Sequence, residues 1–483
     1  MKILFASSEV EPFSKTGGLA DVSHSLPAAL ASRGHQLLVV TPQYRSVKSA
    51  DLKRLGEIRL RFPFGEESAV VRGTNLSNRH RVAFLDHPGF YARDGIYRGT
   101  KEYTDNHRRF AFLSIGALSV AQVLRFNPEI IHLNDWQTAL AALALDRGYR
   151  GTSLDNASSL LTIHNVAYQG VFPKAAMSEL GLPWELFKPE GVEFYDQVNF
   201  LKAGIVFSDA LTTVSPRYAQ EIQTPELGFG LDTILSRRRE DLYGILNGVD
   251  YREWNPGTDP FLRHHFRASD LSHKEQLKRE LLRRLGLAAP SPPARIPVFA
   301  IVSRLVSQKG IDLVLQALPW ILESELYVVV LGSGDRTFEQ GFLQLRDRWP
   351  EKIAVKIGFD AKLAHLFEAG SDFFLMPSRY EPCGLNQMYS LRYGTVPVVR
   401  ATGGLDDTVA DIASPNGTGV KFAPYTASAL AAAIHRALDL YADPARLDEV
   451  RRRGMKADHS WAVSAQRYEE VYQSLRRRSG DNG

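Results

Sequence analysis

The chain has 483 residues, of which 44% are hydrophobic and 23% are charged, a composition that excludes disorder and is typical of two to four globular domains. The 58 Lys and Arg residues exceed the 54 Asp and Glu residues by only four, too few for wholesale nucleic-acid binding. The single cysteine, Cys383, excludes an internal disulfide, a zinc ribbon and an iron–sulfur cluster. No apolar run approaches the roughly 18–20 residues of a membrane span, and the first run is too short for a signal peptide. We therefore expect a cytoplasmic protein without a membrane partner.

Short apolar runs along the chain predict buried strands. These runs are 3–6, 36–41, 129–132, 161–164, 211–214, 298–302, 326–331, 353–357, 373–376 and 396–399. Segments with helical spacing lie between several of them, such as Val22, Leu26 and Leu30. Alternation of strands and helices over this length predicts an α/β fold with parallel sheets that helices cover on both faces.

The predicted strands form two groups, one before about residue 215 and one after about residue 297. We predict a domain boundary beside Asn247, which gives an N-terminal domain over 1–245 and a second domain over 246–455. The Pro-rich stretch 287–297 offers a competing boundary. The remaining segment, 456–483, contains apolar residues at helical spacing, which fits packing on either domain.

Two loops repeat the pattern T-G-G-L-x-D, at 16–21 and at 402–407. Each follows a predicted strand and precedes a predicted helix, which suggests two similarly wound domains with ligand loops at the carboxyl ends of their strands. Lys15 adds a positive charge beside the first loop, and a phosphate site and a simple tight turn explain this pattern about equally well. Neither the P-loop nor the dinucleotide fingerprint is present, since Thr337 stands where a third glycine would follow Gly332 and Gly334.

The loop 303–310 follows a predicted strand and contains Arg304 and Lys309. An Arg fork and a Lys point charge can clamp a diphosphate, although surface loops also carry such cations. The loop 378–386 contains Glu381, whose carboxylate can accept hydrogen bonds from sugar hydroxyls or can simply cap a helix. We expect Cys383 to be a small buried residue without an attacking role.

The segments 132–136 and 162–165 lie at strand ends in the first half and bring Asp135, His132 and His164 into one candidate cleft. Histidines at strand ends are also common as structural residues. The spacing fits no metal site, and no D-x-D motif occurs. The arginine clusters 237–239, 451–453 and 476–478 are expected to be solvated helix faces, because they lack interleaved aromatic residues and any RNA-binding module.

Taken together and in order, several motifs resemble those of bacterial glycogen synthases and plant starch synthases from Lys2 to about Leu475. The motifs are KTGGLADV at 15–22, YTDN at 103–106, NDW at 134–136, HNVAYQG at 164–170, LNGVD at 246–250, SRLVSQKG at 303–310, PSRYEPCGL at 377–385 and TGGL at 402–405.

The resemblance implies two Rossmann-like, doubly wound domains facing each other across a deep cleft, the GT-B architecture. It also implies that the 456–483 helix returns to the first domain. The implied reaction is retaining transfer of glucose from ADP-glucose to the nonreducing-end 4-hydroxyl of an α-1,4-glucan, glycogen or starch. The first domain would face the acceptor and the second would bind the donor. No metal or other cofactor and no nucleic acid would be needed. The choice between ADP-glucose and UDP-glucose and the oligomeric state stay open.

The resemblance assigns roles to individual residues. In the first domain, Lys15 and the Gly18 amide would contact diphosphate and sugar, and Asp135 would belong to the catalytic pocket. His164 and Asn247 would meet the 6-hydroxyl end of the glucose, with the His164 carbonyl near the anomeric carbon. Tyr91 is expected on the acceptor side.

In the second domain, the resemblance makes Arg304 and Lys309 the clamp for the departing diphosphate. Glu381 would hold the glucose 3- and 4-hydroxyls, and Phe359 would stack on the base. Backbone groups of the donor site would come from Cys383, Gly384, Leu385, Gly403 and Gly404.

At three positions the residue differs from the one found in related enzymes. We do not expect the first two differences, at Asn134 and Asp406, to abolish activity. Asn134 stands where many bacterial members have His, and Asp406 replaces a common Ala. Tyr389 occupies the place of a second glutamate found in other retaining enzymes, as it does in glycogen synthases generally.

Three rival functions stay open. They are a glucosyltransferase with another acceptor, a catalytically inactive protein that only binds glucan, and a nicotinamide dehydrogenase, which the missing third glycine opposes.

Overall fold

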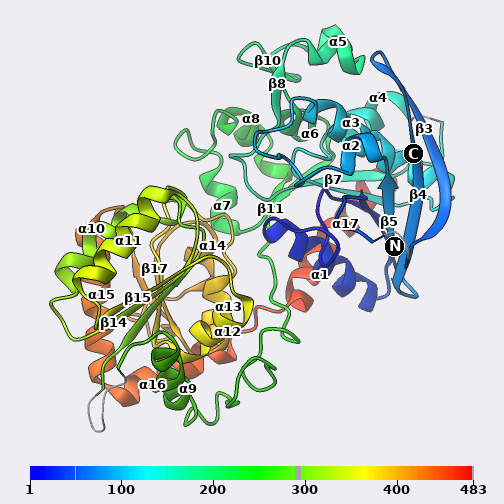
Figure 1. Cartoon of the computed structure of the whole chain (residues 1–483). Helices are drawn as coiled ribbons and strands as arrows, with labels where there is room; N and C mark the ends of the chain where they lie inside the picture. Colours follow the sequence, from blue (N-terminus) through cyan, green and yellow to red (C-terminus); the bar gives the residue numbers. More distant parts are fainter. Residues whose placement is uncertain (49–50, 150, 289–294, 481–483) are drawn as a thin grey trace. The chain divides into compact units, whose positions relative to one another are not determined.

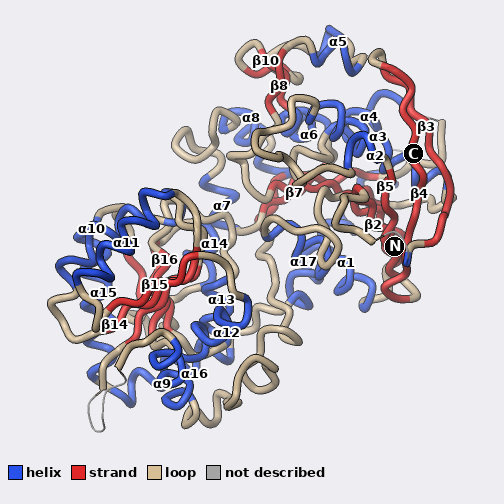
Figure 2. Tube along the Cα trace, in the orientation of Figure 1, coloured by secondary structure: helices blue, strands red, loops and turns tan. Residues whose placement is uncertain are grey.

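The computed structural model describes residues 1–48, 51–149, 151–288 and 295–480. The chain forms two compact units. Unit 1 comprises Met1–Val214, Ala219–Gly248 and Trp461–Gly483, and unit 2 comprises Ser215–Tyr218 and Val249–Ser460. Each unit has its own parallel sheet with helices packed around it, as Figures 1 and 2 show. The predicted α/β fold with two Rossmann-like domains is confirmed.

The main sheet of unit 1 has the strand order β12-β11-β7-β6-β1-β2-β5-β4-β3. The strands from β12 to β5 are parallel, and β4 and β3 extend the sheet in the antiparallel sense. The strands are β1 (Lys2–Ala6), β2 (Gln36–Pro42), β3 (Lys53–Phe62), β4 (Gly65–Ser77), β5 (His80–Asp86), β6 (Ile130–Asn134), β7 (Ser158–Ile163), β11 (Ala210–Thr213) and β12 (Leu242–Gly244). A small sheet is built from β8 (Val171–Pro173), β10 (Gln197–Asn199) and β9 (Glu193–Phe194).

The helices of unit 1 connect these strands and cover the sheet. They are α1 (Gly18–Ser32), α2 (Pro88–Tyr91), α3 (Asn106–Val123), α4 (Leu140–Gly148), α5 (Ala176–Leu180), η2 (Trp184–Leu186), α6 (Phe200–Phe207), α8 (Asp232–Arg237), η3 (Arg239–Asp241) and α17 (Trp461–Gly480). Helix α7 (Pro216–Glu221) begins in unit 2 and ends in unit 1.

The C-terminal helix α17 is part of the core of unit 1. Its residues Tyr468, Tyr472 and Leu475 are buried in one apolar cluster with Phe5 of β1 and Leu26 of α1. In Figure 1, α17 lies beside α1. The last twenty described residues of the chain therefore complete the layer of helices over the N-terminal sheet.

Unit 2 contains a six-stranded sheet in which all pairs are parallel, in the order β15-β14-β13-β16-β17-β18. The strands are β13 (Val298–Val302), β14 (Tyr327–Gly332), β15 (Ile353–Ile357), β16 (Phe373–Met376), β17 (Val396–Arg400) and β18 (Val420–Phe422). The helices are α9 (Lys274–Arg284), η4 (Ser307–Lys309), α10 (Ile311–Ile321), α11 (Arg336–Arg348), α12 (Ala361–Gly370), α13 (Asn386–Arg392), α14 (Gly403–Thr408), α15 (Ala427–Ala442) and α16 (Pro444–Lys456).

Local sequence explains where several helices of unit 2 begin. The side chains of Asp360, Thr426 and Asp443 precede α12, α15 and α16, and each accepts a hydrogen bond from a backbone N–H of the first turn. Such caps satisfy donors that have no partner within the helix. Pro444 at the first helical position of α16 costs no hydrogen bond there.

All ten predicted strands are present, with ends that differ by at most three residues. The strands β3 and β4 were not predicted, because they are largely exposed and carry many charged residues. The strand β5 was also missed, although most of its residues are buried. Within the part of the chain that the structure describes, no helix is long and apolar enough to cross a membrane.

Candidate functional site

Each main sheet has one place where the strand order reverses. In unit 1 the chain proceeds from β1 to β2 on one side, while β6 lies on the other side of β1; in unit 2 the same holds for β13, β14 and β16. Open α/β sheets bind ligands at the carboxyl ends of the two strands that flank such a switch point. The loops at these positions are the ones that contain Lys15, Asp135, Arg304, Lys309 and Glu381.

In unit 1, a buried carboxylate holds the Gly-rich loop that follows β1. Glu9 is only 2% exposed, and its two oxygens accept hydrogen bonds from the Thr16 backbone N–H, from Thr16 Oγ1 at 2.7 Å and from Tyr97 Oη at 2.5 Å. Lys15, next to Thr16, is half exposed and pairs with Asp21 at 2.6 Å. The anchored backbone leaves the Lys15 ammonium at the surface of the loop, where an anion can exchange for Asp21.

Asp135 lies directly after β6 in a left-handed backbone conformation, with φ of 55°. Its Oδ1 accepts the His164 backbone N–H at 2.7 Å, and its carboxylate also accepts the Asn165 N–H. Because the Asn165 N–H and the His164 carbonyl share one peptide plane, Asp135 fixes the direction of that carbonyl. Burial raises the pKa of Asp135 to about 7, against the lowering effect of these two hydrogen bonds.

His164 is a neutral hydrogen-bond donor in this structure. Its Nε2 lies 2.9 Å from Asn134 Oδ1, and an amide oxygen only accepts, so Nε2 carries the proton. Burial lowers the pKa of His164 to about 3. Asn134 in turn donates to the Ala6 carbonyl at 3.0 Å, which ties β6 to β1 beside the switch point. Asn134 thus supplies an oriented acceptor at the position where relatives carry His.

Three other residues of unit 1 that the sequence analysis named differ in their burial and hydrogen bonds. His132 lies in the core, where its nitrogens contact Tyr472 Oη at 2.7 Å and Thr162 Oγ1 at 2.6 Å, so it is a structural residue and lines no cleft. Tyr91 is fully buried and donates to the Arg109 carbonyl at 2.8 Å, which argues against direct contact with an acceptor. Asn247 belongs to unit 1, and its Oδ1 is buried without a hydrogen-bond partner. A ligand hydroxyl would satisfy that acceptor.

In unit 2, the loops after β13 and β16 are joined by an ion pair. Lys309 Nζ lies 2.6 Å from Glu381 Oε2, and Ser378 Oγ donates to the same oxygen at 3.1 Å. Glu381 is 5% exposed, whereas Arg304 is exposed and its Nη2 lies 3.4 Å from Gln308 Oε1. A cation and an acid that can bind sugar hydroxyls therefore meet at the switch point, with a second cation at its surface.

The second Gly-rich loop, after β17, packs directly on the backbone of the Glu381 loop. A Cβ added to Gly403, which has φ of 44°, would lie 1.9 Å from the Glu381 carbonyl oxygen. A Cβ on Gly404 would lie 2.0 Å from the Cys383 carbonyl oxygen. Only glycine permits this approach, so these two residues shape the loop that precedes α13. Cys383 is buried, in agreement with the packing role expected for its side chain.

Two other residues predicted to bind the nucleotide-sugar donor, Gly384 and Leu385, lie within this loop, and a third, Phe359, lies in the loop after β15. Gly384 has φ of 72°, and Leu385 directly precedes α13. Phe359 follows β15 and is 87% exposed, the most exposed large apolar side chain among the described residues. An aromatic ring left in water at the carboxyl edge of the sheet is available for stacking on a base. Asp406 pairs with Lys421 at 2.5 Å, which accommodates the acid that replaces Ala.

Sequence reasoning missed Glu9, Tyr97 and Ser378. Glu9 stands three residues after β1 and is buried, a position where an acid needs partners. In the sequence, Glu9 was recognisable only as an acidic residue near the end of a predicted strand. Tyr97 was hidden because its partner Glu9 is 88 residues away in the sequence. Ser378 stands only three residues before its partner Glu381, but a serine in a loop gives no signal of that contact.

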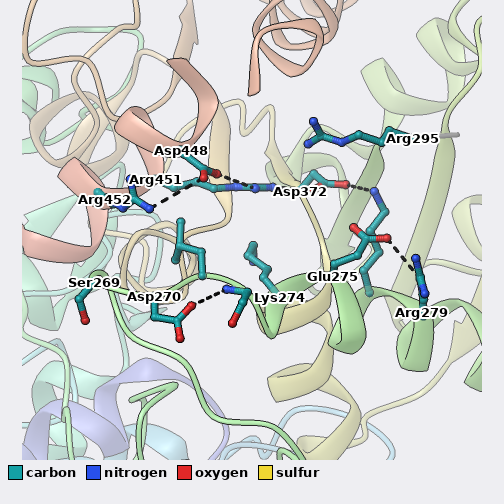
Figure 3. A pocket seen from close by; sticks show the side chains of 13 residues that line it. Ser269, Asp270, Lys274, Glu275, Arg279, Arg295, Asp372, Asp448, Arg451 and Arg452 are labelled. Carbon is teal, nitrogen blue, oxygen red and sulfur yellow. Dashed lines mark hydrogen bonds and ion pairs between the residues drawn. The ribbon is translucent and has the colours of Figure 1, made fainter. Parts of the chain in front are cut away.

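A pocket of about 460 Å³ lies at the opposite, amino edge of the unit 2 sheet (Figure 3). Asp372, just before β16, pairs with Lys278 at 2.7 Å and Arg451 at 2.6 Å and accepts the Val298 N–H at 2.9 Å. Burial opposes ionisation, but Lys278 and Arg451 hold the pKa of Asp372 below its ordinary value. This network braces the starts of β13 and β16. The prediction of a solvated face is therefore wrong for Arg451, which is buried, because Asp372 compensates its charge.

The described residues contain no group of three or more His, Cys, Asp and Glu side chains that could hold a metal ion. The cationic side chains of the candidate loops are Lys15 in unit 1 and Arg304 and Lys309 in unit 2.

The chain is similar to known families and to curated proteins over almost its whole length. The starch synthase catalytic domain family matches residues 2–237, and the glycosyl transferases group 1 family matches residues 289–453. A glycogen synthase from Myxococcus xanthus is 58% identical over 98% of this chain and 99% of its own length. A glycogen synthase from Anaeromyxobacter dehalogenans strain 2CP-1 is 50% identical, with the same two coverages.

Solved structures show the same similarity. The catalytic domain of starch synthase IV from Arabidopsis thaliana, bound to ADP and acarbose, matches with a TM-score of 0.89 and 34% identity over 99% of both chains. Sucrose-phosphate synthase from Thermosynechococcus elongatus, with a TM-score of 0.61 and 18% identity over 98% of both chains, shares the fold. The predicted GT-B class is confirmed. Since close relatives cover almost the whole chain, it belongs to the glycogen synthase family of glycosyltransferases.

Proposed function

We propose that the chain transfers glucose from ADP-glucose, with retention of the α configuration, to the nonreducing-end 4-hydroxyl of an α-1,4-glucan. The observation that carries the proposal is the Lys309–Glu381 pair at the switch point of unit 2, with Arg304 beside it. A cation for a leaving diphosphate and an acid for sugar hydroxyls are the two groups that a nucleotide-sugar donor requires.

In unit 2, the proposed role of Arg304 and Lys309 is to stabilise the negative charge that grows on the diphosphate as the glycosidic bond breaks. Glu381, held by Ser378 and Lys309, would accept hydrogen bonds from the glucose 3- and 4-hydroxyls. Phe359 would stack on the base. Backbone groups of the loop that contains Cys383, Gly384 and Leu385, and of Gly403 and Gly404, would complete the donor site.

In unit 1, we assign Lys15 and the Gly18 amide to the diphosphate and the sugar. The His164 carbonyl, which Asp135 orients, would face the anomeric carbon and stabilise its positive charge in an oxocarbenium-like state. The buried, unpaired Oδ1 of Asn247 would accept a hydrogen bond from the glucose 6-hydroxyl. No side chain in this scheme has to act as a general base, since the leaving phosphate can take the acceptor proton from the same face.

The proposal also covers the identity of the sugar donor and the need for a cofactor. ADP-glucose is preferred over UDP-glucose because the Arabidopsis relative was solved with ADP and acarbose. We propose that no metal or further cofactor takes part, since Arg304, Lys309 and Lys15 supply positive charge for the diphosphate. The cytoplasmic location stays a prediction.

Replacing Lys309 by Ala tests the clamp. The loss of one charged donor to the transition state costs about 3 kcal/mol in comparable sites, so kcat should fall roughly a hundredfold. The control is Lys456→Ala, which removes an exposed lysine from α16 in the same unit. Glucose incorporation into glycogen and ADP release would be measured for both variants. Wild-type turnover by Lys309→Ala would show that the clamp is assigned to the wrong residue.

The rival functions give different outcomes in the same assay. Glucose transfer to a small acceptor with none to glycogen would indicate a different glucosyltransferase. Glycogen binding without diphosphate release from any donor would indicate a glucan-binding protein that has lost its activity.

A further inference from the structure

The side chain of Gln387 is completely buried beside the candidate donor site, and the roles proposed above do not include it. Gln387 stands in the first turn of α13, directly after the Glu381 loop, which comprises residues 377–385. A buried amide needs partners for its oxygen and for both of its N–H bonds. The partners of Gln387 include backbone groups of the Glu381 loop itself.

The amide nitrogen of Gln387 donates to three acceptors. They are the Cys383 carbonyl at 3.0 Å, the Gly384 carbonyl at 3.2 Å and Thr408 Oγ1 at 3.1 Å. Since a side-chain amide has only two N–H hydrogens, two of the acceptors share one of them. These acceptors also determine which end of the amide faces the loop, because an amide oxygen in that place would be repelled by two carbonyl oxygens.

The two carbonyl contacts fix the direction of the two peptide groups to which these carbonyls belong. In a planar trans peptide, the carbonyl and the next N–H point in opposite directions. Both carbonyls face the buried amide of Gln387. The N–H groups of Gly384 and Leu385 therefore point away from that amide, toward the half-buried side of the loop. Within the described residues, neither N–H has a hydrogen-bond acceptor, so both are open to a ligand.

The oxygen of the Gln387 amide has no partner. Oε1 is buried and accepts no hydrogen bond from the described residues, and it packs against Gly384, where an added Cβ would lie only 2.4 Å away. A buried acceptor without a partner costs free energy, so its presence calls for a compensating role. Methionine would fill similar space without this cost, but it could not donate to the two carbonyls. The orientation of the loop, rather than its packing, therefore accounts for a glutamine at this position.

The position of Gln387 is itself fixed by the contacts of α13. Asn386 Nδ2 donates to the carbonyl of the last residue of β13 at 2.8 Å. Tyr389, the residue in place of the second glutamate, stacks on Trp254 with the ring centres 3.9 Å apart and the ring planes 3° from parallel. Thr408 Oγ1 donates in turn to a carbonyl of the second Gly-rich loop at 2.5 Å. Gln387 therefore holds the Glu381 loop from a firmly anchored helix and connects it to the second Gly-rich loop.

We propose that Gln387 is a positioning residue for the glucose of the nucleotide-sugar donor. It aims the Gly384 and Leu385 N–H groups at hydroxyl oxygens of the sugar that Glu381 binds. This inference rests on the proposed function, since it concerns the donor of that reaction. A glucose hydroxyl can donate to a carboxylate and accept an N–H at the same time, so the acid and the two amides act on one sugar. Because ADP lacks the glucose, Gln387 affects the binding of ADP-glucose and not that of ADP.

Two variants of Gln387 test the inference. Gln387→Met keeps the length of the side chain without a donor, and Gln387→Glu keeps its shape, although an ionised carboxylate only accepts. By calorimetry without an acceptor, both should lose about fivefold in affinity for ADP-glucose, the size of one hydrogen bond, and keep their affinity for ADP. With glycogen, kcat/KM for ADP-glucose should fall at least about tenfold because the sugar is misplaced, whereas the KM for glycogen should not change. The control is Phe342→Leu, which removes part of a buried ring from the core of the same unit and should leave both affinities unchanged.

The comparison of ADP-glucose with ADP separates positioning from simple support of the fold. Equal losses of affinity for both ligands would overturn the inference, because Gln387 would then only stabilise the Glu381 loop. Wild-type affinity for ADP-glucose in both variants would also overturn it, and elongation of glycogen by the wild type would still support the proposed function. If the wild type elongates glycogen from no donor but binds ADP-glucose more tightly than ADP, and both variants reduce that difference, the proposed function fails and the role of Gln387 stands.

Discussion

At the scale of single residues, the buried carboxyl of Asp135 makes the stability of the fold depend on pH. Burial raises the pKa of this group to about 7, whereas an exposed Asp titrates near 3.8. A raised pKa in the folded state means that the stabilising contribution is full below pH 3.8 and is lost as the pH rises towards 7. At 1.36 kcal/mol per pH unit, this span corresponds to roughly 4 kcal/mol.

Asp135→Asn should therefore stabilise the protein more at high pH than at low pH. An amide cannot ionise, yet its oxygen still accepts the His164 N–H. Between pH 5 and pH 8, the gain in the free energy of unfolding should increase by roughly 3 kcal/mol, as measured by urea titration. Asp439→Asn, at an exposed position on α15, is the control. Equal effects of Asp135→Asn at both pH values would mean that Asp135 titrates as an ordinary carboxyl.

The sequence identified candidate site residues that stand close together along the chain. Arg304 and Lys309 stand in one loop after a predicted strand, and Gly403 and Gly404 are adjacent, so their pattern is visible along the chain. Glu9 was not predicted, because its partners Thr16 and Tyr97 reach it only in the folded sheet.

At the scale of elements, the site of unit 2 depends on close contact between loops. Gly403→Ala would place a methyl group 1.9 Å from the Glu381 carbonyl oxygen and would strain a residue with positive φ. The Glu381 loop must then move, and we expect at least a tenfold weaker binding of ADP by calorimetry. Gly148→Ala is the matched control, since a Cβ there meets no atom within 4 Å. Unchanged ADP affinity in Gly403→Ala would contradict a donor role for this loop.

Strands buried on both faces were predictable because their apolar runs are continuous, as in β13 and β16. The antiparallel pair β3 and β4 was not, because its side chains are mostly exposed and its charged residues hide the alternation. The short strands β8, β9 and β10 have two or three residues each, too few for a periodic pattern. The exposed strands β3 and β4 and these short strands thus escaped the prediction, as did the mostly buried β5.

At the scale of the whole molecule, the two ends of the chain depend on each other. Tyr468, Val471, Tyr472 and Leu475 of α17 are buried in the core of unit 1. At roughly 1.5–3 kcal/mol for each such side chain, their burial contributes roughly 6–12 kcal/mol. This amount is close to the whole stability of a typical domain, about 5–15 kcal/mol.

A chain that ends at Ser460 should therefore fail to fold unit 1. We expect loss of the cooperative unfolding transition of that unit and a large drop in soluble yield. A chain that ends at Gly480 keeps α17 and should behave as the full chain does. Full activity in the chain that ends at Ser460 would show that α17 is dispensable and that the estimate of its burial energy is wrong.

The central claim is that this chain elongates an α-1,4-glucan from ADP-glucose with retention, and product analysis tests it most directly. The enzyme would be given ADP-glucose or UDP-glucose labelled with ¹³C in the glucose, with glycogen as the acceptor. Nuclear magnetic resonance would then identify the new linkage. The account predicts α-1,4-linked glucose and an equal amount of ADP, with ADP-glucose as the better donor. No incorporation from either donor, or a β linkage in the product, would contradict it.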